Sequence, residues 1–291
     1  MKINLITFFL LLAWLGLSNC GQQNGQRPPD GVREMNVAKA APPAAADTLV
    51  YQVATFEKKV GDCKGGKSGC AVVTIKYPQI VGAASLPIKD ALSNLKREYL
   101  FTPVYSGDSE KKVSINSAEG FAADFFNDFQ TMMKESPGYI SAWEIERKMT
   151  VIDNRPPLMC LKISTYAYTG GAHPNTNTVY VNIDTRTGKR ILLRDIFKAG
   201  FAEKLRPIAE RFFRKQCKIP EGKRWSDLGF FFEKDRFELN DNFILGKSGI
   251  TFYFNPYEIA PYAYGAMKCT IPFKDIRGLI KQNPFIRFNN S

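Results

Sequence analysis

The sequence is poorest in histidine, with a single His among 291 residues. Zinc sites draw most of their ligands from His and Cys, so this scarcity argues against a multi-histidine centre, and we expect no metal and no cofactor. The chain also lacks a Gly-x-Ser-x-Gly nucleophile elbow and a complete P-loop. With 44% apolar and 23% charged residues, it is neither a polytopic membrane protein nor a wholly disordered chain.

Acidic side chains are outnumbered: 28 Asp and Glu oppose 40 Lys and Arg, which gives a formal net charge of +12. The basic residues are scattered along the chain and form no recognised nucleic-acid motif, so we expect no nucleic-acid partner. A basic surface instead favours anionic envelope polymers or lipid head groups.

The N-terminus is apolar from Ile3 to Leu17, a run shorter than the roughly 20 residues of a spanning helix. It is followed by Leu17-Ser18-Asn19-Cys20, which resembles a bacterial lipobox, in which the Cys is lipidated and becomes the first mature residue. The resemblance implies a lipoprotein signal peptide over residues 1–19 and a lipid such as palmitate on Cys20. The alternative is an ordinary cleaved signal or a short signal anchor.

A lipid on Cys20 predicts a protein anchored to a membrane of the bacterial cell envelope, facing the periplasm or the cell exterior. Residues 20–48 have almost no large apolar side chains and end in an Ala- and Pro-rich stretch. They therefore cannot bury a core, and we interpret them as a flexible tether.

Beyond the tether, the pattern predicts the α+β class, with two small units of mostly antiparallel sheet and packed helices over residues 49–155 and 156–291. Strand-like stretches cover residues 50–60, 71–77, 139–152, 158–168, 178–184, 237–245, 249–255 and 267–271. Helical spacing of apolar residues occurs from Ile88 to Tyr99, from Phe121 to Met133 and from Phe201 to Phe213. We expect these stripes to be core rather than ligand sites.

The cysteines fit an exported protein. Cys63 and Cys70 flank a Gly-rich turn between two predicted strands, which predicts a hairpin disulfide. Cys160, Cys217 and Cys269 leave an odd number, and the sequence does not decide which of them pair.

The most specific sequence lies in the second unit. Its motif reads Tyr166-x-Tyr168-x-Gly170-Gly171-Ala172-His173-Pro174, followed by Thr187-Gly188-Lys189 and Asp195-Ile196-Phe197, and later by an aromatic stretch from Phe252 to Gly265. These two separated motifs resemble the RsiV-type extracytoplasmic domain. The preceding region resembles, less distinctly, the unknown-function domain that accompanies PdaC-type deacetylases. The resemblance implies an α+β pair found in cell-envelope proteins of unassigned activity.

The resemblance transfers little chemistry. RsiV-type anti-sigma factors need a cytoplasmic segment, which lipoprotein processing would not leave. PdaC-type enzymes owe deacetylation to a separate metal-binding domain, whereas this chain has only His173. Lysozyme binding meets an electrostatic objection, because common lysozymes are also basic.

Candidate site residues carry two interpretations each. In one interpretation His173 is a general base or a metal ligand. In the other, which we favour, its ring fixes the loop through hydrogen bonds to the backbone. Gly170 and Gly171 are expected at positive φ, and Glu258 is a weak catalytic candidate. Five tyrosines are either core or an aromatic binding surface: Tyr166, Tyr168, Tyr257, Tyr262 and Tyr264.

We therefore predict a lipid-anchored, non-enzymatic envelope module that binds peptidoglycan or an envelope or lysozyme-like protein. The predicted binding residues are Tyr166, Tyr168, Gly170, Gly171, His173, Tyr257, Tyr262 and Tyr264. The alternative is a cell-wall hydrolase or esterase that uses His173 or Glu258.

Overall fold

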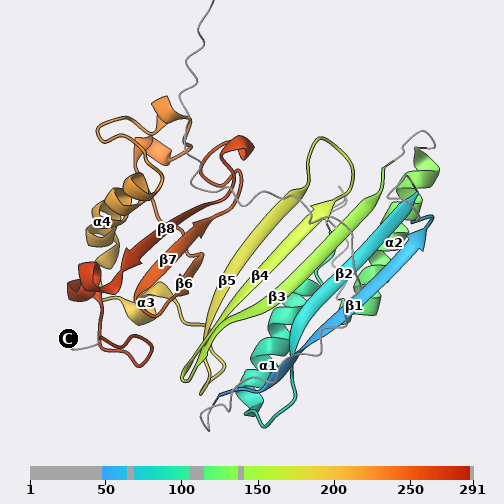
Figure 1. Cartoon of the computed structure of the whole chain (residues 1–291), viewed down its shortest axis with the longest axis horizontal. Helices are drawn as coiled ribbons and strands as arrows, with labels where there is room; N and C mark the ends of the chain where they lie inside the picture. Colours follow the sequence, from blue (N-terminus) through green and yellow to red (C-terminus); the bar gives the residue numbers. More distant parts are fainter. Residues whose placement is uncertain (1–47, 64–68, 105–114, 137–140, 289–291) are drawn as a thin grey trace, which may run out of the picture.

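A computed structural model describes residues 48–63, 69–104, 115–136 and 141–288. These residues form two β-sheets that lie side by side, with helices packed against them (Figure 1). The mixed content and the mostly antiparallel pairing confirm the predicted α+β class. The predicted signal peptide, Cys20 and tether residues up to 47 lie outside the described residues.

The larger sheet has five strands in the order of the sequence. They are β1 (Tyr51–Gly61), β2 (Cys70–Ile80), β3 (Trp143–Arg155), β4 (Leu158–Tyr168) and β5 (Asn175–Asp184). β2 and β3 run parallel, and the other neighbours are antiparallel. Side chains alternate between the two faces: Val73 and Ile75 are buried, while Lys76 projects to the opposite face.

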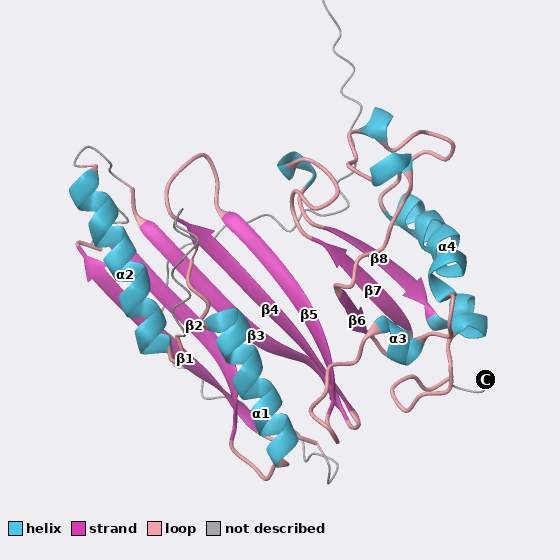
Figure 2. Cartoon of the chain, turned by 180° about the vertical axis from the view of Figure 1, so that it is seen from behind, coloured by secondary structure: helices cyan, strands magenta, loops and turns pink. Residues whose placement is uncertain are grey.

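Two helices cover one face of this sheet, as seen from behind in Figure 2: α1 (Leu86–Leu95) and α2 (Ala118–Glu135). A π-helical turn, Lys96–Leu100, follows α1. The Ser117 side chain caps α2 by accepting a hydrogen bond from the Gly120 amide at 3.0 Å. The phenylalanines of the predicted stripe, Phe121, Phe125 and Phe129, are buried against the sheet as expected, whereas Met132 near the end of the helix is 36% exposed and lies outside the core.

The smaller sheet follows the order β6 (Phe243–Leu245), β7 (Gly249–Phe254) and β8 (Met267–Pro272). α4 (Phe201–Gln216) packs on β8, and a short helix, α3 (Leu193–Ile196), comes before α4 in the chain. Single 3₁₀ segments occupy Ser226–Leu228, Glu233–Asp235, Tyr262–Tyr264 and Phe273–Leu279. Within the described residues, no helix is long and apolar enough to cross a membrane.

The core of the smaller sheet is aromatic. The buried Phe213 ring of α4 lies within 6.1 Å, centroid to centroid, of four other rings: Trp225, Phe230, Phe237 and Phe254. Because these rings come from the long connection between α4 and β6 and from β7, their tilted and edge-to-face contacts hold that connection in place.

The strand predicted over residues 237–245 is shorter than expected, because only Phe243–Leu245 pair with β7. Just before β6, the side chain of Asn240 accepts a hydrogen bond from the Asn242 amide at 3.2 Å. Local side-chain bonds of this kind compete with a backbone ladder, which explains the shortened strand.

Side-chain amides join the two sheets. Asn242 accepts a hydrogen bond from the Tyr180 amide at 2.8 Å and donates to the Thr178 carbonyl at 2.8 Å. Asn255 accepts from the Thr178 amide at 2.7 Å. The free edge of β5 is therefore closed by asparagine side chains rather than by another strand.

The chain passes from one sheet to the other after Asp184, at the end of β5. The predicted boundary between residues 155 and 156 falls instead at the β3–β4 turn, where Arg155 pairs with Leu158. The β3–β4 hairpin lies inside the larger sheet, and the turn signal at Pro156 and Pro157 marks the end of a hairpin.

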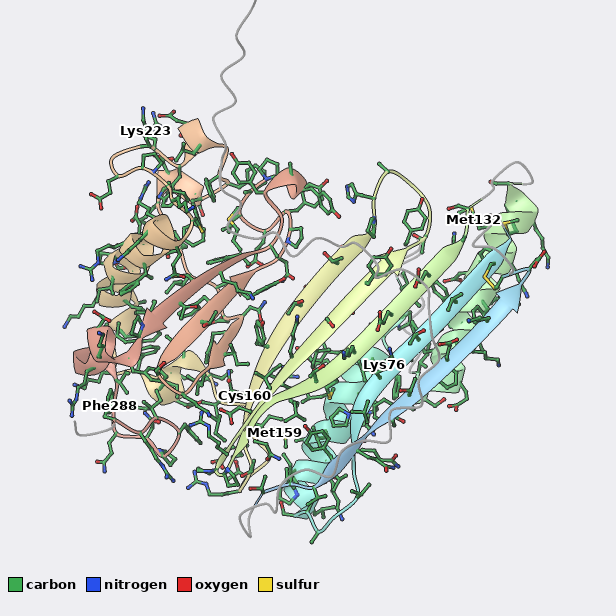
Figure 3. The ribbon with its side chains drawn as sticks, viewed as in Figure 1. Lys76, Met132, Met159, Cys160, Lys223 and Phe288 are labelled. Atoms are coloured by element: carbon green, nitrogen blue, oxygen red, sulfur yellow. A yellow bond between two sulfur atoms is a disulfide. The ribbon has the colours of Figure 1, made fainter. Side chains whose placement is uncertain are left out.

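The described cysteines divide into bonded and free ones. The predicted disulfide between Cys63 and Cys70 is present and links the adjoining ends of β1 and β2. Cys217 is also disulfide-bonded. Cys160 and Cys269 are free and buried, and Cys160 lies on β4 near the junction of the sheets (Figure 3).

We expect both free thiols to be inert in the native protein. Burial raises the pKa of Cys160 and of Cys269 to about 12, and only the thiolate is reactive. At about pH 8, iodoacetamide should label neither residue until denaturant is added, as followed by peptide mass spectrometry. The elevated pKa stabilises the fold below about pH 9, and this contribution is lost as the pH rises toward 12. Rapid labelling of either cysteine in the folded protein would contradict this picture.

Candidate functional site

Two loops at one end of the sheets bring three of the predicted site residues together. The β4–β5 loop carries His173, and the β7–β8 loop carries Tyr257 and Tyr262. We call these three residues the aromatic cluster. The loops lie close to the junction of the sheets, where Asn255, directly after β7, accepts a hydrogen bond from the Thr178 amide of β5 at 2.7 Å.

The imidazole of His173 is the centre of the aromatic cluster. It stacks on the Tyr262 ring with a centroid distance of 3.8 Å and an interplanar angle of 12°. Its Nδ1 lies 3.1 Å from the Pro174 carbonyl oxygen, and its Nε2 lies 3.2 Å from the Tyr257 hydroxyl. A carbonyl only accepts, so Nδ1 carries the proton, and in the neutral ring Nε2 accepts from Tyr257.

The backbone around the cluster adopts uncommon conformations. Tyr257 has φ of +66°, a left-handed conformation that is costly for a residue with a bulky side chain. Gly170 and Gly171 have φ of +94° and +103°, as predicted. Tyr257 is nevertheless 58% exposed. Burial of its ring in a core therefore does not compensate for the cost of this backbone conformation.

The remaining predicted tyrosines have other surroundings. Tyr166 and Tyr168 lie on the face of β4 that the helices leave uncovered, and the Tyr168 hydroxyl donates to the Gly171 carbonyl at 3.1 Å. Tyr264 donates to the Leu228 carbonyl at 2.8 Å and packs on Phe230. Tyr264 therefore belongs to the aromatic core of the smaller sheet and not to the aromatic cluster.

Glu258 positions the loop that carries Tyr257. One of its carboxylate oxygens accepts from the Asn255 amide at 2.7 Å, and the other accepts from the Asn240 side chain at 2.5 Å. The hydrogen bonds of the His173 ring go to Pro174 and Tyr257, so the two catalytic candidates are not hydrogen-bonded to each other.

Asparagine residues are the part of the site that sequence reasoning missed. Asn240 holds Glu258, and Asn255 ties the same loop to β5. Their positions in a loop and at a strand end gave no periodic signal. In the part of the chain that the structure describes, no group of three or more His, Cys, Asp or Glu side chains is placed to hold a metal ion.

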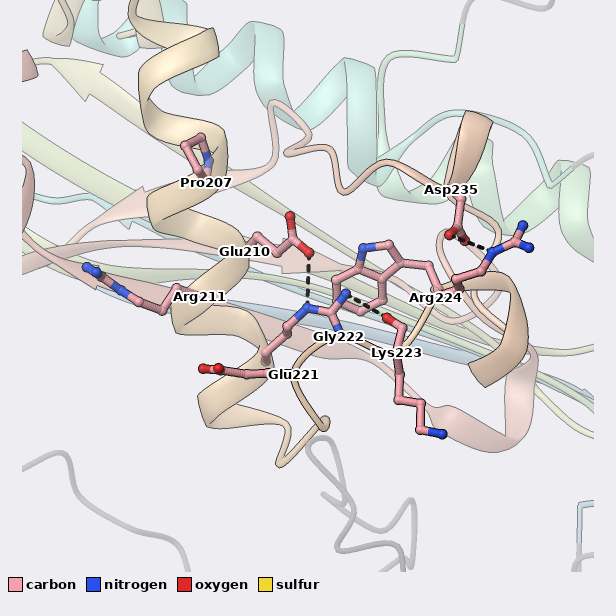
Figure 4. Close-up of a pocket in the computed structure, with 10 residues that line it drawn as sticks. Pro207, Glu210, Arg211, Glu221, Gly222, Lys223, Arg224 and Asp235 are labelled. Carbon is pink, nitrogen blue, oxygen red and sulfur yellow. Dashed lines mark hydrogen bonds and ion pairs between the residues drawn. The ribbon is translucent and has the colours of Figure 1, made fainter.

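A hollow of about 410 Å³ lies beside α4 and is distinct from the aromatic cluster (Figure 4). Several of its polar groups bond to one another. Arg214 stacks on Trp225 at 3.8 Å, pairs with Glu210 at 3.0 Å and donates to the Lys223 carbonyl. Because the Arg214 guanidinium bonds to the Pro220 and Lys223 carbonyls as well as to Glu210, we assign this hollow a structural role in holding the loop after α4.

Known proteins resemble two parts of the chain. Residues 65–176 match the family model described as deacetylase PdaC, and residues 194–274 match the model described as a protein of unknown function, DUF3298. No curated protein matches this chain.

Two solved structures share the fold. A DUF3298 family member from Bacteroides fragilis NCTC 9343 aligns with 81% of this chain and 96% of its own, at 23% identity and a TM-score of 0.65. A DUF3298 family protein from Pseudomonas aeruginosa PAO1 aligns with 83% of this chain and 99% of its own, at 19% identity and a TM-score of 0.61. At these identities the likeness establishes the fold alone. The chain thus combines a region similar to PdaC with a region similar to DUF3298, in the fold of solved DUF3298 proteins.

Proposed function

We propose that this protein is a lipid-anchored binding module of the bacterial cell envelope, and that its aromatic cluster contacts the glycan of peptidoglycan. One observation carries the proposal: His173 stacks on Tyr262 where two loops meet, and the neighbouring Tyr257 ring is exposed although its backbone is strained. Residues held in uncommon conformations concentrate at binding and catalytic sites.

The chemistry of the cluster suits a carbohydrate. The apolar face of a sugar ring stacks on tyrosine, and the tyrosine hydroxyl supplies a hydrogen bond at the wet edge of the same contact. The cluster is pre-organised, because the Tyr262 hydroxyl donates to the Pro174 carbonyl at 3.3 Å while the His173 ring bonds to Tyr257. Little side-chain freedom is then lost on binding. The sequence supports the location through the lipobox-like residues before Cys20.

Replacement of Tyr257 with alanine should lower the retention of the purified protein on peptidoglycan sacculi about tenfold, the effect of a stacking contact of roughly 1–2 kcal/mol. The measurement is a pull-down titration at moderate salt. Tyr51→Ala is the matched control, because Tyr51 is an exposed tyrosine on the edge strand β1, and we expect it to bind as the wild type does.

Equal loss in both variants, or no retention of the wild type above a charge-matched protein, would overturn the proposal. The same preparation separates two other outcomes. Capture of a purified lysozyme, with no affinity for sacculi, would indicate a protein partner. Turnover of muropeptides that Glu258→Gln or His173→Ala abolishes in a folded protein would establish the hydrolase instead.

A further inference from the structure

Among the described residues, no helix covers one face of the larger sheet, and Figure 1 views the molecule from that side. The strand register places polar residues there, opposite the buried residues that pack on α1 and α2. The corresponding face of the smaller sheet bears Tyr253 and Lys268, which are register partners. Their strand neighbours Phe252 and Cys269 are buried against α4.

Lys59 of β1 lies on this open face and pairs with Glu57 at 2.9 Å, and four further lysines lie there on other strands. They are Lys76 of β2, Lys148 of β3, Lys162 of β4 and Lys268 of β8, and we call them the lysine band. Lys76 and Lys148 are register partners, and Figure 3 marks Lys76 on its strand. Lys76 pairs with Glu146 at 3.4 Å. Among the described residues, no carboxylate lies within ion-pair distance of the other three lysines.

Side-chain contacts connect the part of the lysine band on the larger sheet with the part on the smaller sheet. The rings of Tyr180 on β5 and Tyr253 on β7 meet edge to face, 5.6 Å apart. The ammonium group of Lys268 lies 5.9 Å from the centroid of the Tyr253 ring. The pKa of Lys162 is lowered by partial burial and, to a smaller extent, by the charges of Lys268 and Lys148. Lys162 therefore lies close enough to Lys148 and Lys268 for their charges to repel one another.

We propose that the lysine band binds a linear polyanion, a flexible polymer that carries phosphate or carboxylate groups along its length. The argument is charge complementarity: an anionic chain laid over the band would relieve the repulsion among its ammonium groups. Neighbouring strands of a sheet lie about 4.8 Å apart, so a chain laid across β2, β3 and β4 and on to β8 of the smaller sheet would meet several ammonium groups in succession.

The acidic residues of the same face favour a polymer over a planar membrane. Glu144 and Glu146 share the face of β3 with Lys148, and Glu57 lies on the same face of β1. An anionic bilayer would meet these carboxylates together with the lysines, whereas a single chain contacts Lys148, Lys162 and Lys268 and leaves Lys76 to its ion pair with Glu146. This inference does not depend on the proposed glycan contact at the aromatic cluster.

The test compares two triple variants with the same loss of charge. Lys148, Lys162 and Lys268 are changed to glutamine in one protein. In the control, three exposed lysines on helical elements elsewhere, Lys89, Lys204 and Lys274, are changed to glutamine. Binding to fluorescent inorganic polyphosphate is measured by anisotropy over a range of salt, and the two folds are compared by circular dichroism.

We expect the band variant to bind polyphosphate at least tenfold more weakly at low salt, with the slope of log affinity against log salt reduced by about 2. The control variant should lose much less affinity for polyphosphate. Equal loss in both triple variants would show that net charge alone is responsible and would overturn the proposal. Binding to phosphatidylglycerol vesicles with no affinity for polyphosphate or polygalacturonate would also overturn it, in favour of a membrane surface.

Discussion

Replacement of Asn182 with alanine is expected to destabilise the protein by about 3–4 kcal/mol. Asn182 is 2% exposed, and its side chain donates to the Phe243 carbonyl at 2.9 Å and accepts from the Leu245 amide at 3.0 Å. Alanine would leave both backbone groups buried without a partner, at a cost of about 1–3 kcal/mol each. Urea unfolding of the two proteins measures the difference in free energy.

Two further variants show whether hydrogen bonding is the cause. Asn182→Leu restores the volume but not the bonds, so it should remain at least about 2 kcal/mol less stable than the wild type. Asn177→Ala removes an exposed asparagine from the same strand and should stay within about 0.5 kcal/mol. A fully stable Asn182→Leu protein would show that these bonds contribute nothing to joining the sheets.

Replacement of Arg147 with alanine should cost about 3 kcal/mol. This guanidinium is 6% exposed and lies on the helix side of the larger sheet, 4.3 Å from the centroid of the Phe121 ring. It donates to the carbonyls of Leu100 and Thr102, at 3.1 and 2.6 Å. Leu100 is the last residue of the π-helical turn and Thr102 lies two residues beyond it, so Arg147 provides hydrogen-bond donors for carbonyls at the end of this turn.

The burial of Arg147 lowers its pKa to about 10, so the group stays charged at neutral pH. Arg147→Met keeps most of the volume while removing the two hydrogen bonds, and we expect it to fall between the wild type and the alanine variant. Lys148→Ala is the control, since its side chain is exposed on the next position of the same strand. Thermal unfolding within 1 °C of the wild type for Arg147→Ala would contradict the assigned role.

Local periodicity in the sequence predicted most of the secondary structure. The alternation from Leu158 to Tyr168 corresponds to β4 at both ends, and the stripe beginning at Phe121 is the buried face of α2. The disulfide between Cys63 and Cys70 was predictable because both cysteines lie in one hairpin, close in the sequence. The burial of Arg147 was not predictable, because a charged residue within a strand is ordinarily exposed.

The candidate site was predictable only in part. The sequence picked out His173 and Tyr262, but nothing in their spacing of 89 positions indicated that the rings stack. Tyr264 is two residues from Tyr262, yet it turns into the core to reach the Leu228 carbonyl. Neighbours in a loop share no fixed periodicity, so the direction of each ring depends on tertiary packing.

The sequence by itself determined the fold class, the first disulfide and the elements whose pattern repeats every two or nearly four residues, since those patterns depend on neighbours along the chain. Only the tertiary structure decided where one sheet ends and the next begins, which loops meet around His173, and that lysines from four strands share a face. These features depend on the pairing of distant segments, and the asparagine side chains that fix that pairing carry no periodic signal.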